Sequence, residues 1–165
     1  MTTDRRSLLT LAGIGAAGVA LWGYRSAPAS AAEQFPVRMT DAAWKAKLGP
    51  AAYDVLRHEG TERPYSSPLN KEHRAGLFAC KGCGQRAFSS KTKFESGTGW
   101  PSFYAALPGA VASRVDGSML MKRTEIHCKR CGGHLGHVFD DGPEPTGKRF
   151  CMNGVALTFT PAKAA

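Results

Sequence analysis

The pattern of hydrophobic and polar residues changes near residue 60. Before this point, Thr40 suits the cap of a short helix over residues 41–48. Pro50 suits the first turn of a second helix, over 50–57, which Gly60 would end. After this point, short runs of β-branched and aromatic residues alternate with turns rich in Gly, Pro and Ser, which predicts antiparallel β structure. The expected strands are 77–79, 111–114, 124–127, 137–139 and 155–159.

The first 32 residues have a different pattern. Arg5 and Arg6 precede an apolar stretch over 8–22, and small residues follow over 27–32. A basic start, a short apolar core and a small-residue site predict a signal peptide, and the paired arginines indicate the twin-arginine route. The apolar stretch is shorter than the roughly 20 residues needed to span a bilayer, although an uncleaved anchor is the alternative. We expect a mature domain over 33–165, exported to the periplasm of a Gram-negative cell, without a stable membrane span.

Amino-acid composition excludes a disordered protein but does not by itself indicate a function. The chain has 165 residues, of which 42% are hydrophobic and 21% are charged, and these values exclude wholesale disorder and fit one domain. The net charge is +9, of which the first 32 residues contribute +2. The remaining +7 would attract an acidic partner, but charge alone does not favour nucleic acid.

Four of the five cysteines form two C-x-x-C pairs, Cys80 with Cys83 and Cys128 with Cys131. Glycine follows each pair directly, and glycine lets the chain turn tightly so that backbone amides can point at the sulfurs. Two such turns facing each other supply four thiolates in a tetrahedron, which suits one zinc ion. A four-cysteine site has no open position, so this zinc would be structural. Disulfides and a redox-active C-x-x-C are the alternatives in an exported protein.

Cys151 is then the odd cysteine, which suggests a reactive thiol or an intermolecular partner. Lys148 and Arg149 precede it, and positive charge favours the thiolate form. His134 and His137, three residues apart, could approach the same pocket from a Gly-bent strand and supply a proton donor or acceptor. A buried cysteine of no chemical role, and an H-x-x-H pair that binds metal or packs in the core, are the alternatives.

A Trp-Pro turn lies between the two C-x-x-C pairs. Gly97 and Gly99 precede and flank Trp100, and Phe103 and Tyr104 follow closely. Glycines and aromatics in this arrangement suit a shaped apolar pocket rather than a regular strand. A tryptophan that anchors a loop onto the core is the alternative interpretation.

Together these segments resemble the B-type methionine sulfoxide reductases, the methionine-R-sulfoxide reductases. The resemblance covers about 40–159 and implies a mainly β fold with two antiparallel sheets, short peripheral N-terminal helices and a distal four-cysteine zinc site. Several motifs in the right order make it specific. They are Gly-Thr-Glu-Arg-Pro at 60–64, the two C-x-x-C turns, Ser-Gly-Thr-Gly-Trp-Pro-Ser-Phe at 96–103, His-Leu-Gly-His-Val-Phe at 134–139 and Arg-Phe-Cys-Met-Asn at 149–153.

The resemblance also implies roles for individual residues. Cys151 matches the family's nucleophile, which attacks the sulfur of methionine sulfoxide and becomes a sulfenic acid. His134 and His137 match the histidines that protonate the sulfoxide oxygen. Asn153 matches an active-site asparagine, which strand alternation would place on the side of Cys151, and Trp100 matches the ring that packs against the substrate methyl group. Two further polar positions near the family's site are matched by Asp141 and Arg149.

This chain departs from the family at three positions. Many members carry a resolving cysteine where this sequence has Thr98, so no internal disulfide is expected and an external thiol, thioredoxin-like or small, must reduce Cys151. Gly154 replaces a usual serine, and Met152 replaces a usual β-branched residue. Neither change alters the expected reaction type.

The expected function is thiol-dependent repair of methionine-R-sulfoxide, free or in proteins, by a monomer. Three other functions compete with it. An exported zinc-ribbon-like binding module would have no catalysis, and a basic nucleic-acid module would not need Cys151. A zinc hydrolase or deaminase would use His134 and His137 as ligands of an open metal site.

Overall fold

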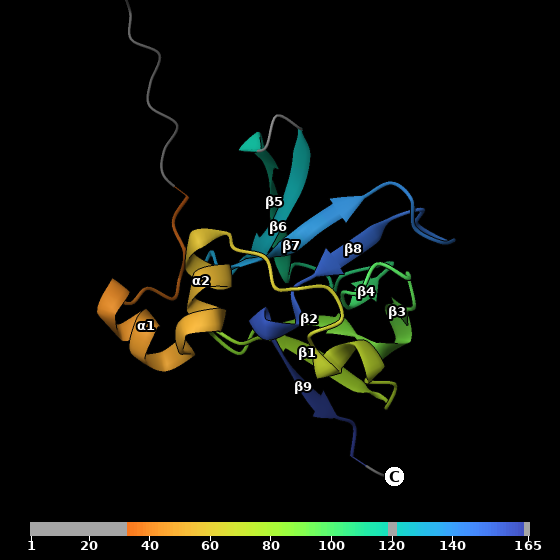
Figure 1. The fold of residues 1–165 in the computed structure, drawn as a ribbon, viewed down its shortest axis with the longest axis horizontal. Helices are drawn as coiled ribbons and strands as arrows, with labels where there is room; N and C mark the ends of the chain where they lie inside the picture. The colour runs from red at the N-terminus through yellow and green to blue at the C-terminus, as the bar shows by residue number, and fades with distance from the viewer. Residues whose placement is uncertain (1–32, 119–121, 164–165) are drawn as a thin grey trace, which may run out of the picture. The chain divides into compact units, whose positions relative to one another are not determined.

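The computed structural model describes residues 33–118 and 122–163, so the predicted signal segment over 1–32 lies outside the described residues. The first elements are the helices α1 (Asp41–Leu48) and α2 (Pro50–His58), shown in Figure 1. The Thr40 hydroxyl accepts a hydrogen bond from the Ala43 amide, as the predicted cap requires. Within the described ranges, no helix has the length and apolar character to cross a membrane.

The strands form two antiparallel sheets (Figure 1). The smaller sheet has the order β2-β1-β9, made of β2 (Arg86–Ser89), β1 (Gly76–Cys80) and β9 (Leu157–Pro161). The larger sheet has the order β3-β4-β8-β7-β6-β5, made of β3 (Lys93–Phe94), β4 (Ser102–Phe103), β8 (Arg149–Met152), β7 (His134–Phe139), β6 (Arg123–Cys128) and β5 (Val111–Asp116). Among the described residues there are three short 3-10 turns: η1 (Pro68–Lys71), which precedes β1, and η2 (Ser90–Thr92) and η4 (Gly154–Ala156), which connect strands of the two sheets.

The predicted fold class, mainly β with two antiparallel sheets and two short helices near the beginning, is confirmed. The predicted strand over 155–159 is wrong at its start, because residues 154–156 form η4 and the strand begins at Leu157. Four strands, β2, β3, β4 and β8, were not predicted. Two of them have only two residues, and β8 contains no β-branched residue, so strand propensity gives no signal there.

Three aromatic side chains connect the two sheets. Phe78 and Phe88 lie on the smaller sheet and Phe103 on the larger one, and all three are buried. The Phe103 ring stacks on Phe88 at 4.5 Å between centroids and meets Phe78 edge-on at 5.0 Å. Aromatic pairs of this geometry add about 0.5–1.5 kcal/mol each beyond the burial of their surface. They fix β4, and with it Ser102, against the rest of the core.

Candidate active site and metal centre

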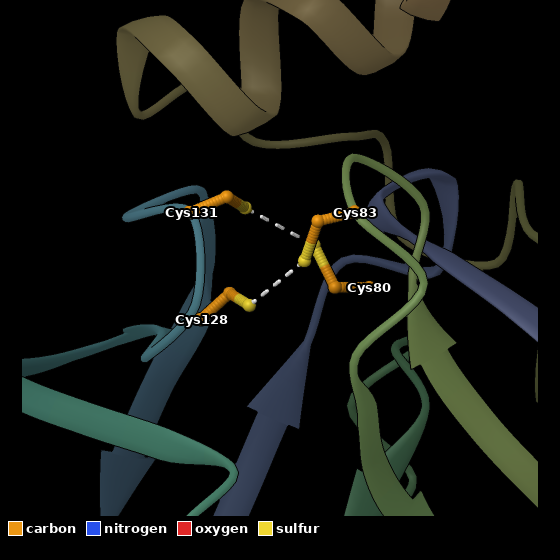
Figure 2. A group of neighbouring side chains, drawn as sticks. All are labelled: Cys80, Cys83, Cys128 and Cys131. Atoms are coloured by element: carbon orange, nitrogen blue, oxygen red, sulfur yellow. Dashed lines mark hydrogen bonds between the residues drawn. The ribbon is translucent and has the colours of Figure 1, made fainter. Parts of the chain in front are cut away.

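The four cysteines of the C-x-x-C pairs converge on one point (Figure 2). Their sulfur atoms all lie within 4.8 Å of one another, with 3.7 Å between Cys80 and Cys131 and 3.5 Å between Cys83 and Cys128. A disulfide would require about 2.05 Å, and all five cysteines of the chain are free. Thiolates at about 2.3 Å from a tetrahedral zinc lie about 3.8 Å apart. The sulfur spacing therefore fits a tetrahedral metal ion.

Each C-x-x-C turn is closed by the glycine that follows it. Gly84 and Gly132 have φ values of 74° and 68°, respectively, in the left-handed region that favours glycine. Their amides donate to the carbonyls of Cys80 and Cys128, at 2.8 Å in both turns. A side chain at Gly132 would also overlap the Phe35 ring. The sequence pattern C-x-x-C-G thus builds the same turn twice.

Backbone amides reach the sulfurs as predicted. Hydrogen bonds from the neighbouring thiols, together with one from the Gln85 backbone, lower the pKa of Cys83. The pKa of Cys128 is lowered in the same way, with the Arg130 backbone as the amide donor. Groups that favour the thiolate form also favour metal binding, because the thiolate is the ligand.

The donor set consists of sulfur alone and is closed. In the described part of the chain, these cysteines are the only group of three or more His, Cys, Asp or Glu placed to hold a metal ion. Cys80 ends β1 in the smaller sheet and Cys128 ends β6 in the larger sheet. A metal held here would therefore join the β1–β2 turn to the β6–β7 turn and leave no position for a substrate.

The fifth cysteine lies in the middle of the larger sheet. Cys151 is on β8, directly opposite His137 of β7 on one side and Ser102 of β4 on the other. Residues in register on neighbouring strands project from the same face of a sheet. A cavity of about 210 Å³ opens at this face. Its lining residues are Thr61, Trp100, Arg123, Gly136, His137, Phe139, Cys151 and Asn153.

A bulge in β7 brings the two predicted histidines together. Residues three apart on a regular strand face opposite sides. Here Ile126 pairs with Gly136 while His127 pairs with His134, so one extra residue of β7 is accommodated. The rings of His134 and His137 consequently meet edge-on at 5.3 Å between centroids.

Only His137 of this pair lines the cavity. Its Nε2 lies 2.8 Å from Oδ2 of Asp116, which also accepts from Arg123 at 2.7 Å. Hydrogen bonds from Ser118, His137 and Arg123 hold the pKa of Asp116 well below its ordinary value. Burial lowers the pKa of His137, and the hydrogen bond to Asp116 partly opposes this effect. Because an ionised carboxylate can only accept, Nε2 carries a proton and Nδ1 is the nitrogen that can exchange one.

His134 lies behind His137, in the interior. Its side chain is 1% exposed, and its Nδ1 lies 2.7 Å from Oε1 of Glu125, which is also paired with Arg114. Burial raises the pKa of Glu125, but the hydrogen bonds from His134 and Arg114 outweigh it and hold that pKa below its ordinary value. The sequence predicts the same role for both histidines, but His137 lines the cavity while His134 is buried behind it.

Of the two predicted cations beside Cys151, only Arg149 faces it. Lys148 is exposed and pairs with Asp140 instead. Arg149 forms a two-pronged ion pair with Asp141, at 2.9 and 2.8 Å, and its guanidinium lies 4.4 Å from the Phe139 ring centroid. The pairing with Asp141 and the interaction with Cys151 both raise the pKa of Arg149. A fixed positive charge therefore lies beside the Cys151 sulfur.

Trp100 and Asn153 both form hydrogen bonds with Glu62, a residue of the 60–64 motif for which the sequence predicts no role of its own. The Trp100 indole donates to the Glu62 carbonyl at 3.1 Å, and the Glu62 amide donates to the Asn153 side chain at 3.0 Å. The Glu62 carboxylate in turn accepts from the amides of Gly154 and Val155. Asn153 follows the end of β8, at the cap of η4, so strand alternation is not what brings it to the cavity.

The two unusual residues beside the site have structural explanations. Met152 is fully buried in the core, on the opposite face of β8 from Cys151, so it is shielded from oxidants that reach the cavity. A side chain at Gly154 would overlap the Ser67 hydroxyl. Glycine is therefore required at this position by the neighbouring Ser67 of this chain.

Three cavity or supporting residues were missed: Thr61, Asp116 and Arg123. Thr61 belongs to the 60–64 motif, which by itself indicates no contact with the cavity. Asp116 and Arg123 are directly opposite each other on β5 and β6. Opposite charges at equal distances from a hairpin tip are a signal that could have predicted this pair, although their contact with His137 depends on the β7 bulge.

The chain is similar to known proteins over most of its length. Residues 48–161 match the SelR domain family. Relatives named "Peptide methionine sulfoxide reductase MsrB" occur in Methanosarcina mazei, 53% identical over 77% of this chain and 91% of the relative, and in Thiobacillus denitrificans, 52% identical over 74% and 93%. The relative of the same name in Agrobacterium fabrum is 48% identical over 76% and 93%. The chain therefore belongs to the SelR domain family, the family of these MsrB proteins.

Proposed function

We propose that this protein reduces methionine-R-sulfoxide to methionine at the expense of thiols, with Cys151 as the nucleophile. One observation carries the proposal: in a chain of this family, the one cysteine outside the four-sulfur cluster lies in a small cavity beside Trp100 and His137. The methionine sulfoxide names of the relatives and the 48–53% identity support the reaction. The exported zinc-ribbon-like binding module is not favoured, because it leaves this cavity without a purpose.

The cavity suits the end of an oxidised methionine side chain. Its volume of about 210 Å³ is enough for a thioether group but small for a larger ligand. Trp100 and Phe139 supply aromatic surface, and sulfur or methyl groups against such rings gain roughly 0.3–1.5 kcal/mol. Trp100 would hold the substrate methyl group, so that one epimer directs its oxygen toward His137.

The first half-reaction transfers one oxygen atom. The Cys151 thiolate attacks the sulfoxide sulfur, a proton is delivered to the oxygen, and methionine leaves while Cys151 becomes a sulfenic acid. The substrate sulfur gains two electrons and the cysteine sulfur loses two. His137, with Nε2 held by Asp116, would deliver the proton through Nδ1, and Arg149 would stabilise the thiolate. General acid assistance of this kind is typically worth about 10²–10⁴-fold.

His134 and Asn153 would act by holding other site residues in position. His134, bound to Glu125, supports the His137 ring from behind. Asn153 holds the segment that carries Glu62 and, through it, the Trp100 indole. In this arrangement neither residue needs to touch the substrate.

The second half-reaction needs an external reductant. Thr98 is 3.7 Å from Cys151 at the position where many family members have a resolving cysteine, and the four other cysteines belong to the metal cluster. An external thiol, thioredoxin-like or small, would attack the sulfenic acid, forming a mixed disulfide and water, and a second thiol would release Cys151. We propose a monomer, in which a single chain supplies the nucleophile, the acid and the cavity wall.

We also propose that the metal is one structural zinc ion. The sulfur-only donor set, its tetrahedral spacing and the amides directed at two of the sulfurs support zinc. Zinc would supply no chemistry to the reaction, because the site is closed and Cys128 lies at the opposite end of β6 from Arg123, which lines the cavity.

Export through the twin-arginine route remains part of the proposal, on the basis of Arg5, Arg6 and the short apolar stretch over 8–22. The full-length protein should be shortened and recovered from the periplasm of a Gram-negative host. In a host that lacks the twin-arginine translocase, it should stay full-length in the cytoplasm. Identical location in both hosts would contradict this route.

The reaction is tested with the two sulfoxide epimers. Purified metal-loaded protein is assayed with methionine-R-sulfoxide and methionine-S-sulfoxide, free and in a peptide, with dithiothreitol as the reductant. We expect reduction of the R epimer alone and its loss in Cys151→Ser. Reduction of the S epimer alone, or of neither epimer, would contradict the proposal.

A further inference from the structure

A continuous line of hydroxyl groups ends on the Cys151 sulfur. Thr98 Oγ1 lies 3.7 Å from Cys151 Sγ and 2.9 Å from Ser96 Oγ. Ser96 Oγ lies 2.7 Å from Ser102 Oγ, which reaches the Trp100 carbonyl at 3.1 Å. The proposed reaction gives none of these three hydroxyls a role.

The line is held in place at both ends. Ser102 is 1% exposed and lies directly opposite Cys151 in the β4–β8 register. The loop that carries Thr98 is fixed from outside, because Tyr65 donates through its hydroxyl to the Gly97 carbonyl at 2.6 Å and Asn70 donates to the Gly99 carbonyl at 2.7 Å. The hydroxyl oxygens therefore have fixed places, and only their protons can turn.

The hydroxyl protons can point along this chain of hydrogen bonds in either of two directions. Each hydroxyl donates once, while a carbonyl can only accept. If Ser102 donates to the Trp100 carbonyl, then Ser96 donates to Ser102, Thr98 donates to Ser96, and Thr98 accepts from the Cys151 S–H. If Cys151 is a thiolate, Thr98 turns and donates to the sulfur, and Ser96 is free to turn and donate to Thr98. Charge-assisted hydrogen bonds are about twice as strong as neutral ones, so the second polarity belongs to the thiolate.

We propose that Thr98, Ser96 and Ser102 form a hydrogen-bond relay whose polarity follows the charge on Cys151, a role that rests on Cys151 as the nucleophile of the proposed function. Thr98 touches the reacting sulfur and stabilises its thiolate. Ser96 and Ser102 are positioning residues, which draw the Thr98 proton away from the sulfur while Cys151 is a thiol. Forming the thiolate thus requires the Thr98 hydroxyl to turn from Ser96 to the sulfur.

Charged groups also face Cys151, and the test must keep them constant. His137 faces it from β7 and Arg149 from β8, while Arg123 of β6 lines the same cavity. None of them is altered by a change at Thr98 or Ser96. Differences between variants in the pH dependence of Cys151 reactivity therefore report on the hydroxyls.

The relay makes two predictions of opposite sign. The measurement is the rate of Cys151 alkylation by iodoacetamide in the metal-loaded protein at pH 5–10, followed by intact mass, with Cys151→Ser as the blank. Thr98→Val should raise the pH midpoint of that rate by about one unit, since it removes a hydrogen bond to a charged group. Ser96→Ala should lower the midpoint by about half a unit, because the Thr98 proton then has only the sulfur to bind.

Two control variants separate the relay from a general loss of structure. Thr98→Ser keeps the hydroxyl and should keep the wild-type midpoint. Thr92→Val removes a hydroxyl that binds the Ala105 and Ser89 carbonyls, away from the cavity, and should also leave the midpoint unchanged.

An unchanged midpoint in Thr98→Val, or shifts of the same sign in Thr98→Val and Ser96→Ala, would overturn the relay. If Thr98→Val fails to fold, Ser96→Ala decides alone: a lowered midpoint supports the relay, and an unchanged or raised one overturns it. Alkylation requires no sulfoxide. The expected shifts in a protein that reduces no sulfoxide would thus refute the proposed reaction and leave the relay standing.

Discussion

The cysteine sulfurs lie in two regions of the molecule, and their neighbouring groups differ between the two. In the metal centre, four sulfurs lie within 4.8 Å of one another, and two of them receive backbone amides. In the cavity, one sulfur has a guanidinium, an imidazole and a hydroxyl as neighbours. The first set can hold a cation between its four sulfurs, whereas the second surrounds one sulfur with polar and charged groups and leaves it open to the cavity.

The two regions also differ in what they connect. A metal at the four-cysteine cluster would join a turn of the smaller sheet to a turn of the larger sheet and would therefore stabilise the whole domain. Cys151 lies in the middle of one sheet, and its side chain points into the cavity. Metal binding and catalysis should therefore be separable by mutation, in both directions.

Replacement of the nucleophile should have the largest effect on activity. We expect Cys151→Ser to reduce R-sulfoxide reduction by more than about 10³-fold, because no other described sulfur lines the cavity. The metal content and the thermal midpoint should stay at the wild-type values. Steady-state assays, elemental analysis and calorimetry check the three quantities, and retained activity would remove the distinction between the two regions.

Loss of a metal ligand should have the largest effect on stability. We expect Cys128→Ser to lose the metal and to lower the melting temperature by more than about 10 °C, because metal binding to such a site is part of the folding free energy. Cys131→Ser should behave in the same way, since it removes another ligand from the same turn. A Cys128→Ser protein with full metal content and the wild-type melting temperature would show that this ligand set is incorrect.

A smaller effect is expected where a carboxylate orients His137. Asp116→Asn should lower kcat/KM by about tenfold, a part of the general acid contribution. Because the Asp116 hydrogen bond raises the pKa of His137 against the effect of burial, its loss should move the His137 titration to lower pH, as followed by NMR.

Asp140→Asn is the matched control for this substitution. Asp140 is exposed and pairs with Lys148 outside the cavity, so its loss should change neither kcat/KM nor the His137 titration. An Asp116→Asn protein with an unchanged His137 titration would contradict the positioning role of Asp116.

The smallest effect on activity is expected when a second thiol is placed next to Cys151. Thr98→Cys should form an internal disulfide with Cys151 after one turnover, because the Thr98 hydroxyl already lies 3.7 Å from the sulfur. Mass spectrometry should detect a loss of two hydrogens in the variant and none in the wild type. A wild-type protein that forms an internal disulfide in each cycle would show that one of the metal cysteines takes part in turnover.

Local features of the sequence predicted much of this arrangement. The Thr40 cap, the C-x-x-C-G turns and the isolation of Cys151 depend on neighbouring residues and on counting, so they could be seen without the fold. The resemblance added Trp100 and Asn153, and both line the cavity with Cys151.

The remaining features depend on contacts between distant segments. Glu62 acts across more than 90 residues, through the amides of Gly154 and Val155, and nothing near it in the sequence indicates these partners. The β7 bulge decides that His137 lines the cavity while His134 lies deeper, and a bulge depends on pairing with β6. Likewise, Lys148 and Arg149 are adjacent in sequence but have different partners, because Lys148 precedes β8 and pairs with the exposed Asp140, whereas Arg149 begins β8 and pairs with Asp141.

One single-turnover experiment tests the separation of the two sulfur regions most directly. The metal-loaded protein is mixed with one equivalent of methionine-R-sulfoxide without any reductant, and the products are analysed by peptide mass spectrometry and elemental analysis. We predict one equivalent of methionine, one added oxygen on the peptide that contains Cys151, and undiminished metal. Oxidation of any of the other four cysteines with release of the metal, or no oxygen transfer at all, would contradict the account.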